Sequence, residues 1–148
     1  MNNELIKQKS WWKNNWKWFI TISGLVLISI SVFISSGMGT ISADLAKAYS
    51  DTELYENALE KVKSNQKVND LLGQIEPIDK LAILEGTVHY TNENQTVNST
   101  IRLKGTKGKA KMDISADRIH NEWNYTKIKV RIKNPPESKQ TIEILKLE

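Results

Sequence analysis

The chain has 148 residues, a formal net charge of +4 and no cysteine. Without cysteine it cannot form disulfides, ligate an iron–sulfur cluster or carry copper on thiolates. Most of the charge lies in the first 18 residues, where four lysines and one glutamate give +3 and leave +1 for the remainder. The remainder therefore suits one small, nearly neutral domain that packing alone holds together.

The first 18 residues form a tail rich in lysine and tryptophan. Tryptophan rings favour the headgroup zone of a bilayer, and lysines meet anionic headgroups there. In a helix Trp12, Trp16 and Phe19 share one face. An interfacial anchor is the favoured interpretation and a docking helix for another membrane protein is the alternative, whereas nucleic-acid binding is disfavoured because the tail abuts the bilayer. The predicted membrane-interface residues are Trp11, Trp12, Lys13, Trp16, Lys17 and Trp18.

An uncharged apolar run, residues 19–39, follows the tail. As a helix it is long enough to cross a bilayer core, which takes about 20 apolar residues. Only a helix can do so, because lipid offers no partner to a free backbone N–H or C=O. We therefore predict a transmembrane helix over residues 19–39. The alternative is a cleaved secretory signal, but the run is too long for one and no cysteine follows it for lipid attachment.

Charge on the two sides of the apolar run predicts its orientation. The N-terminal flank is basic, whereas residues 42–53 mix three acids with Lys47. Because positive flanks stay on the cytoplasmic side, we expect residues 1–18 to be cytoplasmic and residues 40–148 to form an exported domain. These features predict a single-pass protein of the cell (inner) membrane, with its C-terminal domain periplasmic or extracytoplasmic.

Helices are expected at the start of the exported domain. Ser50 and Glu53 fit a capping box, in which a hydroxyl and a carboxylate cover free N–H groups at a helix start. Gly73 is a candidate left-handed stop, and Pro77 prevents continuation. The apolar stripe at helical spacing comprises Tyr55, Ala58, Leu59, Val62, Val68, Leu71 and Leu72.

Beyond residue 81 the apolar residues no longer recur at helical spacing but at every second position. This alternation is typical of strands that have one solvent-exposed face. Turn residues separate the alternating segments. Asn92–Gln95 has the composition of a turn, and Gly105–Gly108 predicts a tight hairpin whose glycines accept positive φ. The predicted strands cover residues 82–90, 97–104 and 110–117.

A fourth strand, over residues 122–133, changes its apolar phase along its length. Its first apolar residues are odd-numbered and its later ones even-numbered, so we expect a bulge near Thr126–Lys127. Pro135–Pro136 ends this strand, and residues 141–147 form a last, edge strand. The order of a membrane helix, one or two helices and an antiparallel meander of four or five strands predicts an α+β fold.

Catalytic and metal-binding constellations are not apparent. His89 is expected on the polar face of a strand and His120 in a turn, and no acid, base and nucleophile come together. Gly105–Lys109 superficially resembles a phosphate loop, but it lacks the spacing and joins two strands. Asn-x-Ser/Thr matches at positions 94, 98 and 124 matter only in a host with glycosylation machinery. We therefore predict no enzyme activity, no cofactor and no metal.

One surface feature suggests binding. If the strands are neighbours, their lysines and arginines share the wet face and its hairpin, and this basic surface faces anionic lipid or an acidic partner. Ordinary solubility charge, diluted by Asp113 and Asp117, is the alternative. The basic residues of this face are Arg102, Lys104, Lys107, Lys109, Lys111, Lys127, Lys129, Arg131 and Lys133. The candidate partner-binding residues among them are Lys107, Lys109, Lys111, Lys127, Lys129 and Arg131.

Motifs along nearly the whole chain resemble those of one family. They are the tail Trp11–Trp18, Tyr55-x-x-Ala58-Leu59, Asn65, Val68, Leu72-Gly73, Gly105–Ala110 and Glu122-Trp123. With the single membrane helix they resemble the bacterial branch of the cytochrome oxidase complex assembly protein family. Its mitochondrial relatives share a domain related to a small subunit of the inner-membrane protein translocase. In the hairpin, Thr106 stands where proline is expected in this family.

The resemblance implies a non-enzymatic accessory protein that binds maturing subunits of a respiratory oxidase, and it carries over no catalytic residue. A second hypothesis comes from the basic face, which suits an envelope-surface module that binds anionic lipid or another envelope component. Bound partners distinguish the two: oxidase subunits should co-purify under the first hypothesis, and the domain should bind lipid under the second.

Overall fold

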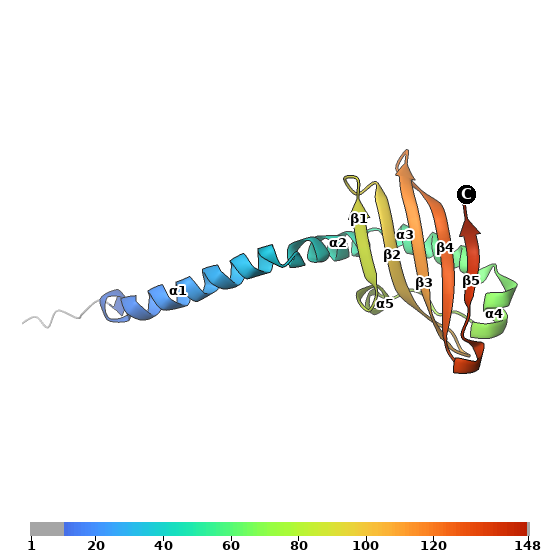
Figure 1. Cartoon of the computed structure of the whole chain (residues 1–148), viewed down its shortest axis with the longest axis horizontal. Helices are drawn as coiled ribbons and strands as arrows, with labels where there is room; N and C mark the ends of the chain where they lie inside the picture. Colours follow the sequence, from blue (N-terminus) through green and yellow to red (C-terminus); the bar gives the residue numbers. More distant parts are fainter. Residues whose placement is uncertain (1–10, 148) are drawn as a thin grey trace, which may run out of the picture. The chain divides into compact units, whose positions relative to one another are not determined.

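The computed structural model describes residues 11–147. The chain divides into two compact units, Met1–Gly39 and Thr40–Glu148. The second unit has helices followed by a five-stranded antiparallel sheet, which confirms the predicted α+β class (Figure 1). The first part of the predicted tail, residues 1–10, lies outside the described residues.

Helix α1, Trp11–Ser35, makes up most of the described part of the first unit. Within residues 11–147, Asn15–Ser35 is the one helical stretch long and apolar enough to cross a membrane, with a mean hydropathy of 2.2. Gly37 has a φ of 73° and interrupts the helix, so α1 ends at Ser35, inside the predicted range 19–39. A second helix, α2, spans Met38–Ser50.

Helix α3 spans Thr52–Lys63. Its junction with α2 differs from the predicted capping box. Ser50 is the last residue of α2, and its hydroxyl donates to the Ala46 carbonyl oxygen at 3.2 Å. Asp51 is the residue before α3, and its side chain makes no capping bond because it binds groups on the sheet instead. The predicted stripe of α3 is buried, as Tyr55, Ala58, Leu59 and Val62 show.

Helix α4, Gln66–Leu72, has both ends fixed by local chemistry. At its start the Asn65 side chain accepts a hydrogen bond from the Val68 N–H at 3.1 Å. At its end Gly73 stops the helix as predicted, but its φ of 70° and ψ of −150° lie outside the left-handed helical region that was expected. Val68 and Leu72 are buried, so the apolar stripe continues through this helix.

Helix α5, Lys80–Leu84, replaces the first part of the strand predicted over residues 82–90. Asp79 caps it, because its carboxylate accepts a hydrogen bond from the Ala82 N–H at 2.6 Å. The short helix buries the adjacent residues Ala82 and Ile83, which no strand could place on one face. Strand β1 is therefore confined to Thr87–Thr91.

The strands form a meander in the order β1-β2-β3-β4-β5, each antiparallel to the next. Their bounds after β1 are Thr96–Lys104, Lys109–Ile119, Glu122–Asn134 and Thr141–Lys146. The bulge predicted in β4 is present, since Ser115 faces Lys127 whereas Ala116 faces Tyr125, leaving Thr126 as the extra residue.

The Gly105–Gly108 hairpin is tight for a different reason from the one predicted. Neither of its glycines has a positive φ. A Cβ at Gly105 would instead collide with the carbonyl oxygen of Leu72, and a Cβ at Gly108 with that of Asn134. These glycines therefore serve a close approach of backbone to backbone.

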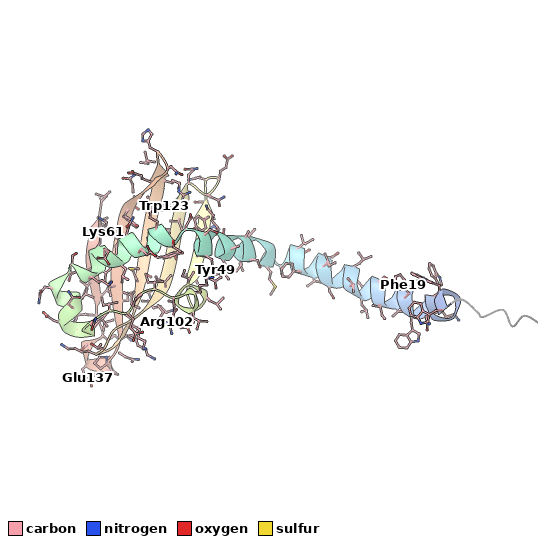
Figure 2. All side chains as sticks on the ribbon, turned by 180° about the vertical axis from the view of Figure 1, so that it is seen from behind. Phe19, Tyr49, Lys61, Arg102, Trp123 and Glu137 are labelled. Atoms are coloured by element: carbon pink, nitrogen blue, oxygen red, sulfur yellow. The ribbon has the colours of Figure 1, made fainter. Side chains whose placement is uncertain are left out.

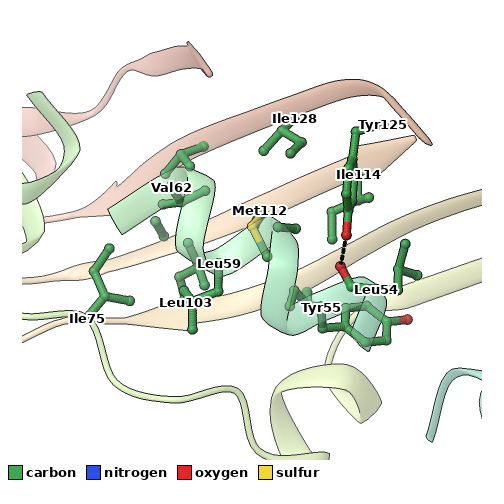
Figure 3. Close-up of a cluster of buried hydrophobic side chains, with 14 of the residues drawn as sticks. Leu54, Tyr55, Leu59, Val62, Ile75, Leu103, Met112, Ile114, Tyr125 and Ile128 are labelled. Atoms are coloured by element: carbon green, nitrogen blue, oxygen red, sulfur yellow. Dashed lines mark hydrogen bonds between the residues drawn. The ribbon is translucent and has the colours of Figure 1, made fainter. Parts of the chain in front are cut away.

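The core lies between α3 and α4 and one face of the sheet, which we call the inner face (Figure 3). The hydroxyl of Tyr125 crosses this interface and donates to the Leu54 carbonyl oxygen at 2.7 Å. The largest fully buried side chains are Tyr55, Leu54, Leu72, Ile101, Leu103, Met112, Ile114, Ile128, Ile132, Val62, Val68 and Val97.

Candidate protein-binding face

The face of the sheet turned away from α3 and α4, which we call the outer face, carries most of the charged strand residues. Alternation along β2, β3 and β4 buries apolar side chains on the inner face and directs polar ones outward. The basic residues on the outer face are Arg102, Lys104, Lys109, Lys111, Lys127, Lys129 and Arg131. Lys107 lies in the hairpin, and Lys133 lies in an irregularity at the end of β4 where it faces no residue of β3.

The strand register places cations directly opposite one another. Arg102 faces Lys111, and Lys111 faces Arg131, so three cations form a row across β2, β3 and β4. Two further facing pairs are Lys104–Lys109 and Lys127–Lys146. Because like charges opposite each other destabilise a sheet, this arrangement does not serve stability.

Acidic residues at the margins of the outer face neutralise part of this charge. The ion pairs are Arg102–Asp79 at 3.2 Å, Arg102–Glu85 at 3.4 Å, Lys104–Glu76 at 2.9 Å and Lys129–Glu143 at 3.5 Å. These pairs are largely exposed and contribute little to stability.

Asp113 makes the tightest of the outer-face interactions. Its carboxylate accepts hydrogen bonds from Nε and Nη2 of Arg131, both at 2.6 Å, and from the Thr100 hydroxyl at 2.7 Å. Partial burial alone would raise the pKa of Asp113, but the bonds from Arg131 and Thr100 outweigh it and hold the pKa below its usual range. The bond to Asp113 likewise raises the pKa of Arg131.

The six predicted partner-binding residues fall into two groups. Within residues 11–147, the side chains of Lys109, Lys111 and Lys127 make no hydrogen bond or ion pair, although the charge of Lys127 helps to lower the pKa of Asp113. Lys107 donates from Nζ to the Asp70 carbonyl oxygen at 3.2 Å and ties the hairpin to α4. Lys129 and Arg131 are paired with acids. The unpaired cations are therefore concentrated on β3 and β4.

A shallow hollow of about 310 Å³ lies on the outer face beside Lys127. Polar side chains line it, including Thr100 and Ser115, whose hydroxyl donates to Asn98 Oδ1 at 2.7 Å. His89 stands at its rim and lies 3.1 Å from a carboxylate oxygen of Asp44. The hollow gives a partner's polar side chain a place next to an unpaired lysine.

The predicted membrane-interface residues lie on the first turns of α1. The four tryptophans are exposed by 52–72%, and Lys17 is exposed as well. The rings of Trp12 and Phe19 are 4.9 Å apart, as their predicted shared helix face requires. The Lys13 side chain lies outside the described part of the chain.

A buried polar cluster on the inner face was not predicted from the sequence. The Asp51 carboxylate, 9% exposed, lies 2.9 Å from Arg118 Nη2 and 3.3 Å from Lys47 Nζ. It also accepts a hydrogen bond from the Tyr90 hydroxyl at 3.0 Å. The Arg118 guanidinium lies over the Trp123 ring, 4.2 Å from its centroid. The cluster joins the α2–α3 junction to β1 and β3.

The tyrosines around this cluster stay neutral near pH 7. Burial, together with neighbouring Tyr55 and Asp51, raises the pKa of Tyr90 well above its usual range. Burial and nearby Glu53 raise the pKa of Tyr125 to about 12. These hydroxyls therefore act as hydrogen-bond donors that hold the fold rather than as proton-transfer groups.

Among residues 11–147, no three His, Asp or Glu side chains are arranged to hold a metal ion. His120 is exposed in the β3–β4 turn, where it and Asn121 have positive φ.

Similarity to known proteins gives this surface a biological setting. Residues 26–146 match the family described as cytochrome oxidase complex assembly protein 1. No curated protein and no solved structure matches the chain. The matched range starts within α1 and includes every later helix and the whole sheet, which is well over half of the sequence. As the motifs in its tail, helices and hairpin predict, this chain belongs to the cytochrome oxidase complex assembly protein 1 family.

Proposed function

We propose that this chain is a membrane-anchored, non-catalytic assembly factor that binds subunits of the cytochrome oxidase complex. The family match over residues 26–146 carries the assembly role. The apolar stretch Asn15–Ser35 supports the anchor, because its length and hydropathy suit a bilayer core. Anchoring would hold the domain near integral subunits and so raise its effective concentration for them.

We place the contact with the subunits on the outer face. Lys109, Lys111 and Lys127 support this choice, because their side chains are unpaired and each of them faces another cation across the strands. Surface charges that weaken their own sheet are readily explained by a partner of opposite charge. Acidic side chains on a subunit would remove the repulsion when they bind.

Co-purification tests the assembly role directly. The full chain, tagged at its C-terminus and extracted in mild detergent, is expected to retain cytochrome oxidase subunits identified by mass spectrometry. Deletion of the gene is expected to lower the amount and activity of the oxidase. An unchanged oxidase level after deletion, with no subunit retained, would remove the basis for the proposal.

The orientation of the anchor is tested separately. The lysine-rich tail predicts that the N-terminus is cytoplasmic and the domain extracytoplasmic. Reporters fused after Glu148 should be active only outside the cytoplasm, and neutralising Lys13 and Lys17 should weaken this preference. A reporter active in the cytoplasm would contradict the proposed topology.

The facing lysine pairs also favour a second function, binding of anionic lipid by the outer face. Vesicles of neutral lipid with and without one third phosphatidylglycerol distinguish the two. The tagged chain in nanodiscs of neutral lipid should not capture the anionic vesicles if subunits are the partners. Salt-sensitive capture of anionic vesicles, without retention of oxidase subunits, would favour the lipid function.

A further inference from the structure

The first residues of strand β4 extend past the end of β5. β5 pairs with Lys127–Arg131, and the Leu147 N–H continues the contact by donating to the Thr126 carbonyl oxygen at 3.0 Å, whereas β4 begins at Glu122 and pairs with β3 from there to Asn134 with two irregularities. Figure 1 shows the β3–β4 hairpin projecting beyond the arrow of β5. The edge of β4 over residues 122–125 therefore faces no strand in the described part of the chain.

The hydrogen-bond pattern of the hairpin shows which backbone groups point to this open edge. His120 and Asn121 form a two-residue turn, so the flanking pair Ile119–Glu122 exchanges hydrogen bonds. Because hydrogen-bonded and non-hydrogen-bonded pairs alternate, the next pair, Arg118–Trp123, exchanges no hydrogen bonds. The N–H and C=O of Trp123 therefore point away from β3. The same alternation turns the N–H and C=O of Tyr125 outward.

An independent contact supports this assignment. The N–H of Arg118, the residue opposite Trp123, donates to the Gln95 carbonyl oxygen at 2.6 Å, on the side away from β4. Arg118 and Trp123 thus form a non-hydrogen-bonded pair, as the alternation requires. The two donors and two acceptors of Trp123 and Tyr125 therefore point away from β3, on the side where the pairing of β5 within residues 11–147 does not reach them.

The outermost edges of the sheet are protected, in contrast to this one. β1 has only five residues. β5 has an irregular register beside Ile144 and carries two charged residues, Glu143 and Lys146. Short length, bulges and charge are the usual ways in which proteins prevent edge pairing. The open end of β4 is also short and lies beside the bulge at Thr126, but its only charged residue is Glu122 and it presents the aromatic residues Trp123 and Tyr125.

A groove of about 560 Å³ lies alongside the open edge. Trp123, Tyr125 and Leu145 line it from the sheet, and polar residues of α3, including Asn57 and Lys61, line it from the helix. Figure 2 shows Lys61 and Trp123 at the same end of the domain. Lys61 Nζ lies 5.8 Å from the centroid of the Tyr125 ring.

We propose that the open end of β4 accepts an extended segment of a partner protein as an added strand. The segment would run antiparallel to β4, in line with β5, and exchange backbone hydrogen bonds with Trp123 and Tyr125. The two residues of the segment that lie opposite Trp123 and Tyr125 are separated by one residue. Their side chains are therefore on the same face of the added strand, and both would enter the groove. In the cell the donor would be a segment of an oxidase subunit, and this part rests on the proposed function.

The lining of the groove defines the chemistry of the occupant. Aromatic rings and Leu145 offer apolar contact on the sheet side, whereas Asn57, Glu60 and Lys61 offer polar partners on the helix side. Side chains with an apolar body and a polar tip, at alternate positions of the segment, fit both walls. The site is therefore expected to prefer alternating sequences with Tyr, Gln or Arg at positions i and i+2.

Two variants of one residue isolate the backbone bond. Trp123→Ala removes the ring but keeps the N–H, and Trp123→Pro removes both. Proline is acceptable there because this N–H takes no part in the β3 ladder. The probe is a library of ten-residue synthetic peptides with alternating sequence, titrated onto the full chain in detergent micelles. We expect selected peptides to bind Trp123→Pro roughly tenfold more weakly than Trp123→Ala.

Amide hydrogen exchange gives a readout that does not depend on the ring. In the free chain the amides of Trp123 and Tyr125 should exchange quickly, and bound peptide should protect both. Fast exchange of either amide in the presence of bound peptide, equal binding by the two variants, or the absence of any binding peptide would overturn the proposal. Protection of these amides in the free chain would do so as well.

The same measurement with oxidase subunits separates this proposal from the proposed function. If subunits bind and library peptides protect neither amide, the added strand is wrong and the assembly role stands. If library peptides bind with protection but no subunit is retained, the site stands and the assembly role fails. Unfolding curves of both variants ensure that weaker binding does not reflect a lost fold.

Discussion

The two faces of the sheet use charge in opposite ways. On the inner face, the buried Asp51 carboxylate lies 2.9 Å from the partly buried Arg118 guanidinium and accepts a hydrogen bond from the Tyr90 hydroxyl. On the outer face, Lys111 is flanked by Arg102 and Arg131 and has no acid within ion-pair distance among the described residues. The same residue types therefore hold the fold on one face and weaken it on the other.

This difference separates structural charge from charge available to a partner. A buried ion pair is costly to break, because removal of one member leaves the other without solvent or partner. An exposed lysine contributes almost nothing to stability and repels its neighbours. Changes to buried or paired charges should thus act on unfolding, and changes to the unpaired lysines of the outer face should act on binding.

The largest expected effect follows removal of Arg118. Arg118→Ala leaves the buried Asp51 carboxylate without its guanidinium partner and should lower the free energy of unfolding by about 3 kcal/mol. Denaturant unfolding of the full chain in detergent measures this loss. Lys111→Ala, on the outer side of the same strand, is the matched control and should change stability by less than about 0.5 kcal/mol. Equal losses in the two variants would remove the distinction between the faces.

A smaller loss is expected at the hairpin. Gly108→Ala places a Cβ against the Asn134 carbonyl oxygen and should cost about 2 kcal/mol by forcing the backbone apart. Gly39→Ala is the control, because a Cβ there meets no atom within 4 Å. Thermal unfolding of both variants decides the matter. A Gly108→Ala chain as stable as the parent would show that the close approach is not required.

The Asp113–Arg131 pair should make a modest contribution that depends on pH. Asp113→Asn should lower the free energy of unfolding by about 1–2 kcal/mol at pH 7, because the Arg131 bonds lose their charge. The folded pKa of Asp113 lies below the ordinary value of 3.8, so its stabilisation is present above that pH and is lost as pH falls through the folded pKa. Unfolding curves between pH 7 and pH 2 should therefore converge for parent and variant at the acid end. A difference that stays constant with pH would contradict this assignment.

Local patterns predicted most elements of the fold. In β4 the apolar residues change from odd to even positions, and this change predicted a bulge near Thr126–Lys127. One extra residue there lets the apolar side chains of both halves of the strand face the core, and the structure has this extra residue at Thr126. At residues 82–85 the same periodicity misled, since Asp79 caps a short helix there. Asp79 is a favourable capping residue and could have indicated a helix start. The alternation of apolar and polar residues over Ala82–Tyr90 favoured a strand instead.

Contacts across the fold could not be predicted in the same way. Asp51 and Arg118 are 67 residues apart, and only their tertiary positions bring them together. One signal was available: Arg118 continues the apolar phase of β3 that runs from Ala110 to Ala116, which places it inside. The roles of Gly105 and Gly108 likewise depend on the backbones of α4 and β4, which pass close by only in the folded chain.

The basic face was predicted in outline, because alternation alone places its lysines on one side. Which of them are free depends on acids from other elements. Glu143 on β5 forms an ion pair with Lys129, and Asp113 on β3 forms one with Arg131. Lys129 and Arg131 are therefore less available to a partner than the sequence suggests. Lys127, Lys109 and Lys111 remain the most direct candidates for contact.

Charge reversal on the outer face tests the central claim most directly. The variant carries Lys109→Glu, Lys111→Glu and Lys127→Glu, and its control reverses Lys67, Lys80 and Lys139, which lie on α4, on α5 and before β5. Both lose the same net charge. The first should retain roughly tenfold less oxidase subunit in mild detergent, at an unfolding free energy within about 1 kcal/mol of the parent, while the control retains normal amounts. Full retention by the outer-face variant, or an equal loss in both, would contradict the account.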